Sequence, residues 1–141
     1  MKNIQTFIFD WSGTISDDRH PVYKANALMR QDYGIQADLT FEDWLDNVSM
    51  SVSEGFKEKY GVNATKDEID ALYKKRFNEI IEQGTEPIVY PDATEVLKFL
   101  KNQNRQIFVL SAHPSKNLIQ EAKRYGAASF VTELIGDSRD K

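Results

Sequence analysis

The feature that most constrains the fold lies near the start of the chain, where an apolar run ends in a carboxylate, a glycine and hydroxyl side chains. Residues 4–9 are rich in β-branched and aromatic side chains, and Asp10-Trp11-Ser12-Gly13-Thr14 follows them. A strand that is apolar on both faces is typical of a central parallel strand covered by helices. Open α/β sheets carry their reactive groups at the carboxyl ends of such strands. We therefore expect Asp10 to lie at a sheet edge and to be central to function.

The segment that follows this strand has helical rather than strand patterns. Apolar residues recur at steps of three and four, and each stretch begins with a proline or with a hydroxyl residue three positions before an acid. Such pairs predict capping boxes, in which the two side chains satisfy free backbone N–H groups. Residues 16–86 therefore predict a run of helices without a strand. The start signals are Pro21, Thr40 with Asp43, Ser51 with Glu54, and Thr65 with Glu68.

Strand and helix patterns alternate again in the last third of the chain. Pro91 suits the first turn of a helix, and residues 106–110 form a second apolar strand pattern that Ser111 ends. A further helix pattern follows that strand. Residues 129–131 predict a third, short strand, and residues 134–141 predict a loop at the sheet edge.

This order of elements predicts an α/β fold with a Rossmann-like parallel sheet. Residues 1–15 and 87–141 would form the core, and residues 16–86 would form an inserted helical cap. Right-handed crossovers place the carboxyl ends of parallel strands at one edge. We therefore expect Asp10 and Ser111 to be neighbours, and the insertion after the first strand could act as a lid.

Composition narrows the class of protein. The 18 basic and 22 acidic side chains give a net charge of −4 and form no basic block, which argues against a nucleic-acid partner. The chain has no cysteine, so disulfides and thiolate catalysis are excluded and a cytoplasmic protein is expected. No apolar run approaches the roughly 20 residues of a membrane span. The start of the chain passes directly into the first strand, so no leader is expected.

Several of these features in order resemble the haloacid dehalogenase-like (HAD) hydrolase superfamily with a helical cap. They are Asp10-Trp11-Ser12-Gly13-Thr14 after a strand, the helical block, Tyr90-Pro91-Asp92, and the strand ending in Ser111. The resemblance implies a Mg²⁺-dependent phosphohydrolase, similar to a phosphatase, that acts on a small phosphorylated metabolite. It implies that Asp10 attacks the phosphoryl group and forms an aspartyl-phosphate, which water then hydrolyses.

The resemblance also implies a role for each residue of the site. Mg²⁺ would bind the Asp10 carboxylate and the Ser12 main-chain carbonyl, and would offset the repulsion between carboxylate and phosphate. The Ser111 hydroxyl would bind a phosphoryl oxygen, and Lys141 would neutralise charge. The predicted catalytic residues are Asp10, Ser12, Ser111 and Lys141; the phosphate-binding residues are Gly13, Thr14 and Ala112; and the metal ligands are Asp10, Ser12 and, as an alternative, Asp137 with Asp140.

Ser12 departs from the family pattern. The family has an aspartate there, two positions after the nucleophile, which protonates the leaving oxygen and then activates water. A hydroxyl cannot do this near neutral pH. General acid–base catalysis contributes about 10²–10⁴ in rate, so Ser12 predicts a poor phosphomonoesterase unless the leaving group needs no proton.

An alternative function follows from the same position. Phosphonoacetaldehyde hydrolase, the branch that cleaves a carbon–phosphorus bond, is similar in having Trp after the nucleophile and a small residue at this place. That branch uses a cap lysine to form a Schiff base, for which Lys57 and Lys59 are the candidates. The other interpretation of both lysines is a solvated helix face.

The end of the chain is the second departure. Lys141 fits the family lysine, but the strand and acidic pair that hold Mg²⁺ are missing from these 141 residues, which implies a fragment or a minimal, inactive member. Two binding functions therefore stay open: a receiver-like signalling module, against which the helical insertion argues, and a degenerate HAD protein kept for interaction. His113 follows Ser111 at the sheet edge and either faces the phosphate or has a simple loop role, while His20 is expected to be an exposed turn residue.

Overall fold

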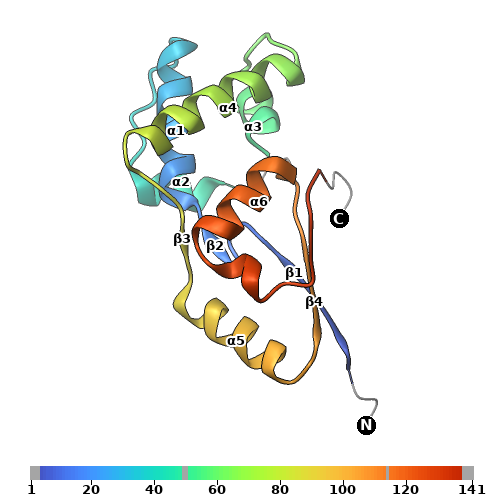
Figure 1. Cartoon of the computed structure of the whole chain (residues 1–141). Coiled ribbons are helices and arrows are strands. Elements are labelled where there is room, and N and C mark those ends of the chain that lie inside the picture. The colour runs from blue at the N-terminus through green and yellow to red at the C-terminus, as the bar shows by residue number, and fades with distance from the viewer. Residues whose placement is uncertain (1–3, 49–50, 114, 138–141) are drawn as a thin grey trace. The chain divides into compact units, whose positions relative to one another are not determined.

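The computed structural model describes residues 4–48, 51–113 and 115–137. These divide into two compact units; Figure 1 shows the chain coloured by residue number from the N-terminus to the C-terminus. The sheet unit comprises Met1–Asp17 and Ile88–Lys141, and the helical unit comprises Asp18–Pro87. The assignment of the chain to an enzyme core and a cap, with the boundaries given above, stays a prediction.

The sheet unit contains a parallel sheet with strand order β1-β4-β5, which confirms the α/β class with a parallel sheet. β2 and β3 form a separate two-residue antiparallel ladder, so residues 16–17 are a short strand where helix was expected. The elements of this unit are β1 (Thr6–Asp10), β2 (Ser16–Asp17), β3 (Ile88–Val89), α5 (Pro91–Asn102), β4 (Gln106–Leu110), α6 (Ser115–Arg124), the 3₁₀ helix η1 (Ala127–Ser129) and β5 (Glu133–Ile135).

The core of the sheet unit lies on one face of the sheet. Ile107 and Val109 of β4 are fully buried against residues of α5 and α6, and Phe7 and Phe9 of β1 flank the same cluster. The opposite face is less covered by the described residues, since Ile8 of β1 is 68% exposed. The prediction that β1 is buried on both faces is therefore wrong for the described residues. β4 is the middle strand, and α5 and α6 both pack on the Ile107 face.

The third strand lies later in the chain than the sequence predicts. Residues 129–131 do not form a strand: Gly126 adopts a left-handed conformation with φ 76° and begins η1, which ends at Ser129. Strand β5 follows at Glu133–Ile135 and pairs with β4, within the segment expected to be a loop. Phe130 and Val131 still pack against the core. Their apolar character therefore reflects burial beside the sheet.

The described residues of the helical unit form four α-helices around a second cluster that includes the buried side chains of Met29, Phe56 and Ile69. α4 packs against both α1 and α3. The three predicted capping boxes are all present, at Thr40, Ser51 and Thr65. The helices are α1 (Arg19–Asp32), α2 (Phe41–Asn47), α3 (Val52–Glu58) and α4 (Lys66–Glu82).

Within the described ranges, no helix combines the length and the apolar character needed to cross a membrane.

Candidate active site

The carboxyl ends of β1 and β4 meet at one edge of the sheet. Asp10 is in register with Leu110 in a parallel pair, and Ser111 follows directly. Asp10 is partly buried, and its Oδ1 accepts a hydrogen bond of 2.8 Å from the Trp11 backbone N–H. Ser111 is only 1% exposed, and its backbone N–H donates to the carbonyl of Ile135 on the next strand, at 2.9 Å. The chain topology thus places the predicted nucleophile and hydroxyl on neighbouring strand ends.

The loop after β1 closes as a tight turn. The Trp11 carbonyl accepts hydrogen bonds from three successive backbone N–H groups, and the Gly13 N–H donates to the Ser16 carbonyl at 2.7 Å. Gly13 has φ 74°, a conformation that side chains with a Cβ adopt only at a cost. Gly13 and Thr14 are exposed at this turn. The three donors to Trp11 are Thr14, Ile15 and Ser16.

Trp11 fixes this loop to the body of the sheet unit. Its side chain is fully buried in the core cluster, and the indole Nε1 donates a hydrogen bond of 2.8 Å to Glu121 Oε2 on α6. A buried indole combines a large apolar contact with a satisfied polar end. The residues on either side of Trp11 are Asp10 and Ser12. Their backbone positions therefore depend on a side chain that packs behind the site.

His113 links the two loops at the sheet edge. Its Nδ1 lies 3.4 Å from Ser12 Oγ and 3.3 Å from Ser111 Oγ, and its backbone N–H donates to Ser111 Oγ at 3.1 Å. The ring is half-buried. Sequence reasoning named His113 but left its role open, and it had no means of pairing it with Ser12, because the two residues are 101 positions apart. The structure therefore places an imidazole beside the Ser12 hydroxyl.

The segment after β5 packs closely on the His113 loop. A Cβ on Gly136 would lie 2.7 Å from the His113 carbonyl oxygen and 2.6 Å from Ser115 Cα, so only glycine fits there. Asp137 is exposed and has φ 57°. Its N–H donates to the His113 carbonyl at 2.8 Å. Its Oδ2 accepts from the Ser115 N–H at 3.1 Å and from Ser115 Oγ at 2.7 Å, and so caps the first turn of α6.

The remaining predicted site residues are Ala112, Asp137, Asp140 and Lys141, and the structure describes only the first two. Ala112 is exposed between Ser111 and His113. A metal role for Asp137 stays a prediction beside its observed capping role. Lys141 and Asp140 lie outside the described residues, so their roles stay predictions too.

The donor types at the edge fit a magnesium ion. Within residues 4–48, 51–113 and 115–137, no group of three or more His, Cys, Asp or Glu side chains gathers to hold a metal. Mg²⁺ does not require such a cage, because it keeps several waters and is held by one or two carboxylates together with substrate phosphate oxygens. The Asp10 carboxylate and the Ser12 carbonyl are oxygen donors of the required kind.

The family comparison covers almost the whole chain, matching the haloacid dehalogenase-like hydrolase family over residues 4–141. No curated protein sequence matches. Solved structures do match, among them a protein from Clostridium difficile assigned as a phosphatase (TM-score 0.75, 19% identity, 100% of this chain and 64% of that chain). A haloacid dehalogenase-like family protein from Streptococcus pneumoniae matches with a TM-score of 0.71 and 15% identity. That match covers 99% of this chain and 64% of the other. A predicted phosphoglycolate phosphatase from Haemophilus somnus matches with a TM-score of 0.71 and 18% identity. That match covers 98% of this chain and 64% of the other.

These structural likenesses establish the fold alone, because the identities are low. The chain spans 64% of each of these three proteins. The match to the family itself extends from the first described strand through the helical insertion to Ser111 and beyond. The chain belongs to the haloacid dehalogenase-like hydrolase family.

Proposed function

We propose that this protein is a Mg²⁺-dependent phosphohydrolase that acts on a small phosphorylated metabolite through an aspartyl-phosphate on Asp10. The observation that carries the proposal is the meeting of Asp10 and Ser111 at the ends of neighbouring parallel strands. Membership of the hydrolase family supports it, and so do the phosphatase assignments of the similar structures.

In the proposed reaction, an Asp10 carboxylate oxygen attacks phosphorus and forms a new P–O bond. The bond from phosphorus to the leaving oxygen breaks, and that oxygen takes up a proton. Water then attacks the acyl-phosphate, which releases inorganic phosphate and restores the carboxylate. The Ser111 hydroxyl and the backbone N–H groups of the Gly13 turn are the donors for phosphoryl oxygens. When bound, Mg²⁺ supplies positive charge that offsets the repulsion between the carboxylate and the phosphate.

We assign the proton transfer to His113. Ser12 cannot act as the acid, but its Oγ lies 3.4 Å from His113 Nδ1. In its imidazolium form, His113 would donate its Nδ1–H to Ser12 Oγ and carry a second proton on Nε2. Histidine is the commonest general acid and base in enzymes. The imidazolium would protonate the leaving oxygen from Nε2, and the neutral imidazole that remains would accept a proton from the attacking water at the same nitrogen.

The first test removes the nucleophile. Asp10→Asn is expected to abolish Mg²⁺-dependent hydrolysis of p-nitrophenyl phosphate and the formation of a base-labile acyl-phosphate. Asp92→Asn is the matched control, because Asp92 is a carboxylate of the same unit that accepts a hydrogen bond of 3.0 Å from its neighbour's N–H. Asp92→Asn should retain turnover. Equal activity of Asp10→Asn and wild type would contradict the proposal.

The second test addresses His113 through the leaving group. His113→Gln should lower the hydrolysis of an alkyl phosphate by about 10²–10⁴, since an alkoxide leaves poorly without a proton. It should affect p-nitrophenyl phosphate far less, because nitrophenolate leaves unaided. His20→Gln, at the other histidine of the chain, is the control. A loss of the same size with both substrates would assign His113 a structural role only.

The carbon–phosphorus hydrolase remains the alternative. It requires a Schiff-base lysine; both candidates, Lys57 and Lys59, are exposed, and Lys59 also lines a pocket of the helical unit. Borohydride reduction in the presence of phosphonoacetaldehyde would trap the substrate on Lys59 if this function is correct. If the protein hydrolyses a phosphoester, traps no phosphonoacetaldehyde and releases no phosphate from it, the phosphoester hydrolase is favoured over the carbon–phosphorus hydrolase.

A further inference from the structure

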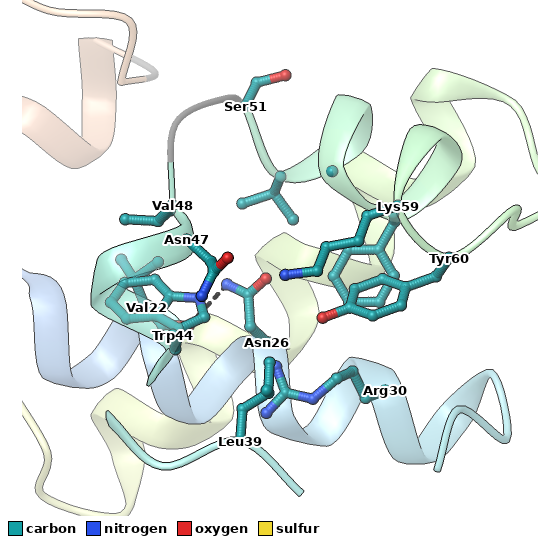
Figure 2. Close-up of a pocket in the computed structure, with 13 residues that line it drawn as sticks. Val22, Asn26, Arg30, Leu39, Trp44, Asn47, Val48, Ser51, Lys59 and Tyr60 are labelled. Carbon is teal, nitrogen blue, oxygen red and sulfur yellow. Dashed lines mark hydrogen bonds between the residues drawn. The ribbon is translucent and has the colours of Figure 1, made fainter. Parts of the chain in front are cut away.

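A pocket lies entirely within the helical unit, between residues of α1, α2 and α3 (Figure 2). Its volume is about 110 Å³. Its walls are mainly apolar and include Leu39, Trp44 and Phe56. For comparison, an engineered cavity of about 150 Å³ binds benzene, so this pocket has room for a hydrocarbon body of only a few carbon atoms.

The pocket contains a buried guanidinium, one nitrogen of which is unsatisfied among the described residues. Arg30 lines it and is only 4% exposed. Its Nε is fully buried and has no hydrogen-bond partner in the part of the chain that the structure describes. A charged group removed from water costs free energy unless it is paired and hydrogen-bonded. The fold therefore holds a guanidinium in a state that a bound anion would relieve.

The surroundings of Arg30 also favour an anion. Asn26, one helical turn before Arg30, is 7% exposed and lines the same pocket, where its Nδ2 donates to the Val22 carbonyl at 2.8 Å. Figure 2 shows Lys59, the residue after α3, extended along the pocket with its ammonium directed toward the side formed by Asn26. None of the described residues that line the pocket is acidic. Positive charge is therefore not neutralised within the pocket wall.

We propose that this pocket binds a small organic carboxylate. The planar guanidinium of Arg30 matches a carboxylate in geometry and can donate two parallel hydrogen bonds to it. Lys59 lies at the pocket as a second cation, and Leu39, Trp44 and Phe56 accommodate a short hydrocarbon body. The small volume and apolar walls favour this ligand over a phosphate dianion, which needs more donors. The inference does not depend on the proposed hydrolase function, because every residue involved lies in the helical unit.

The test compares butyrate with butyramide, which has nearly the same shape but no charge. Titration with butyrate should move the NMR signals of the Trp44 indole N–H and the Arg30 Nε–H until they saturate. Butyramide should bind at least about tenfold more weakly, because hydrogen bonds to a charged group are worth more than neutral ones. Inorganic phosphate should also bind more weakly than butyrate, because the mainly apolar walls offer few donors to its oxygens. Equal shifts with butyrate and butyramide, or tighter binding of phosphate, would overturn the proposal.

Two arginine variants provide the matched comparison. Arg30→Met should weaken butyrate binding about tenfold or more, and Arg76→Met, which removes a paired guanidinium elsewhere in the same unit, should leave it unchanged. If both variants lose binding equally, the effect is general and the assignment to Arg30 is wrong. If Arg30→Met does not fold, the comparison of butyrate with butyramide on the wild-type chain still decides.

Discussion

The polar groups at the sheet edge and those of the pocket are held in opposite ways. At the edge, the side chains bind one another or the backbone: Asp10 accepts from the Trp11 N–H, Ser111 from the His113 N–H, and Asp137 from Ser115. In the pocket, the Nε of Arg30 is buried without a partner among the described residues. An organised set of donors can act without rearrangement, as catalysis requires. A buried unpaired cation instead gains most when a ligand arrives, as recognition requires.

Trp11→Ala should give the largest effect, because it removes the packing that supports the sheet edge. Trp11 is fully buried, and loss of a buried aromatic side chain costs about 3–5 kcal/mol of unfolding free energy. Trp11→Phe is the control: it keeps most of the packing and loses only the hydrogen bond to Glu121. Urea unfolding measures both. A cost below about 1 kcal/mol for Trp11→Ala would show that the edge does not depend on this anchor.

Arg30→Met should change stability in the opposite direction. A buried charge without a hydrogen-bonding partner costs free energy, so we expect the ligand-free variant, which lacks that charge, to unfold at a higher temperature. Arg76→Met should unfold at a lower temperature, since Arg76 is paired with Asp32 and Glu79. A lower unfolding temperature for Arg30→Met would break the comparison, because it would mean that Arg30 already has a stabilising partner.

Gly136→Ala should affect the sheet edge through His113. The new Cβ would meet the His113 carbonyl and the Ser115 backbone at 2.6–2.7 Å, and such overpacking costs about 1–3 kcal/mol. Gly13→Ala has no atom within 4 Å of its Cβ, so its cost of about 1–2 kcal/mol would come from its positive φ alone. The NMR signals of the His113 ring should shift in Gly136→Ala. Unchanged signals there would show that the two segments are not coupled.

The sequence predicted those features that local pattern controls. Three capping boxes and the strand at 106–110 follow from neighbouring residues, and parallel topology then brings Asp10 and Ser111 together. The third strand was misplaced because residues 129–131 and 133–135 are both short and partly apolar. The choice between them depends on pairing with β4, which lies more than twenty residues earlier. The exposure of Ile8 likewise depends on which face the helices cover.

The residues that the sequence could not assign are those whose partners lie far along the chain. His113 meets Ser12 across 101 positions, and Asp137 meets Ser115 across 22. Arg30 did have a local signal, because Val22, Asn26 and Arg30 recur at steps of four along one helix and so share a face. Valine is unusual on a solvated helix face, so the presence of Val22 on the same face indicates that Arg30 is not fully solvated. The pattern alone did not show that the guanidinium would lack a partner.

The smallest effect concerns the paired arginine. The hydrogen bond from the Arg76 guanidinium lowers the pKa of Asp32 below its ordinary value of 3.8. A carboxyl whose pKa is lower in the folded state contributes stability above its unfolded pKa and loses it as pH falls through the folded value. Asp32→Asn should therefore lower the unfolding temperature slightly at pH 7. The difference from wild type should shrink as pH falls below about 4.

Asp70→Asn is the matched control for this pH series. Asp70 pairs with Lys66 at 2.8 Å, but the two side chains are 45% and 68% exposed, against 26% and 25% for Asp32 and Arg76. Exposed pairs contribute little, so Asp70→Asn should change the unfolding temperature less than Asp32→Asn at pH 7. A difference between Asp32→Asn and wild type that is the same at pH 3 and pH 7 would mean that charge does not stabilise the Arg76 pair. The carboxylate partner of Arg76 would then give no stability that Arg30 lacks, and the contrast between the two arginines would fail.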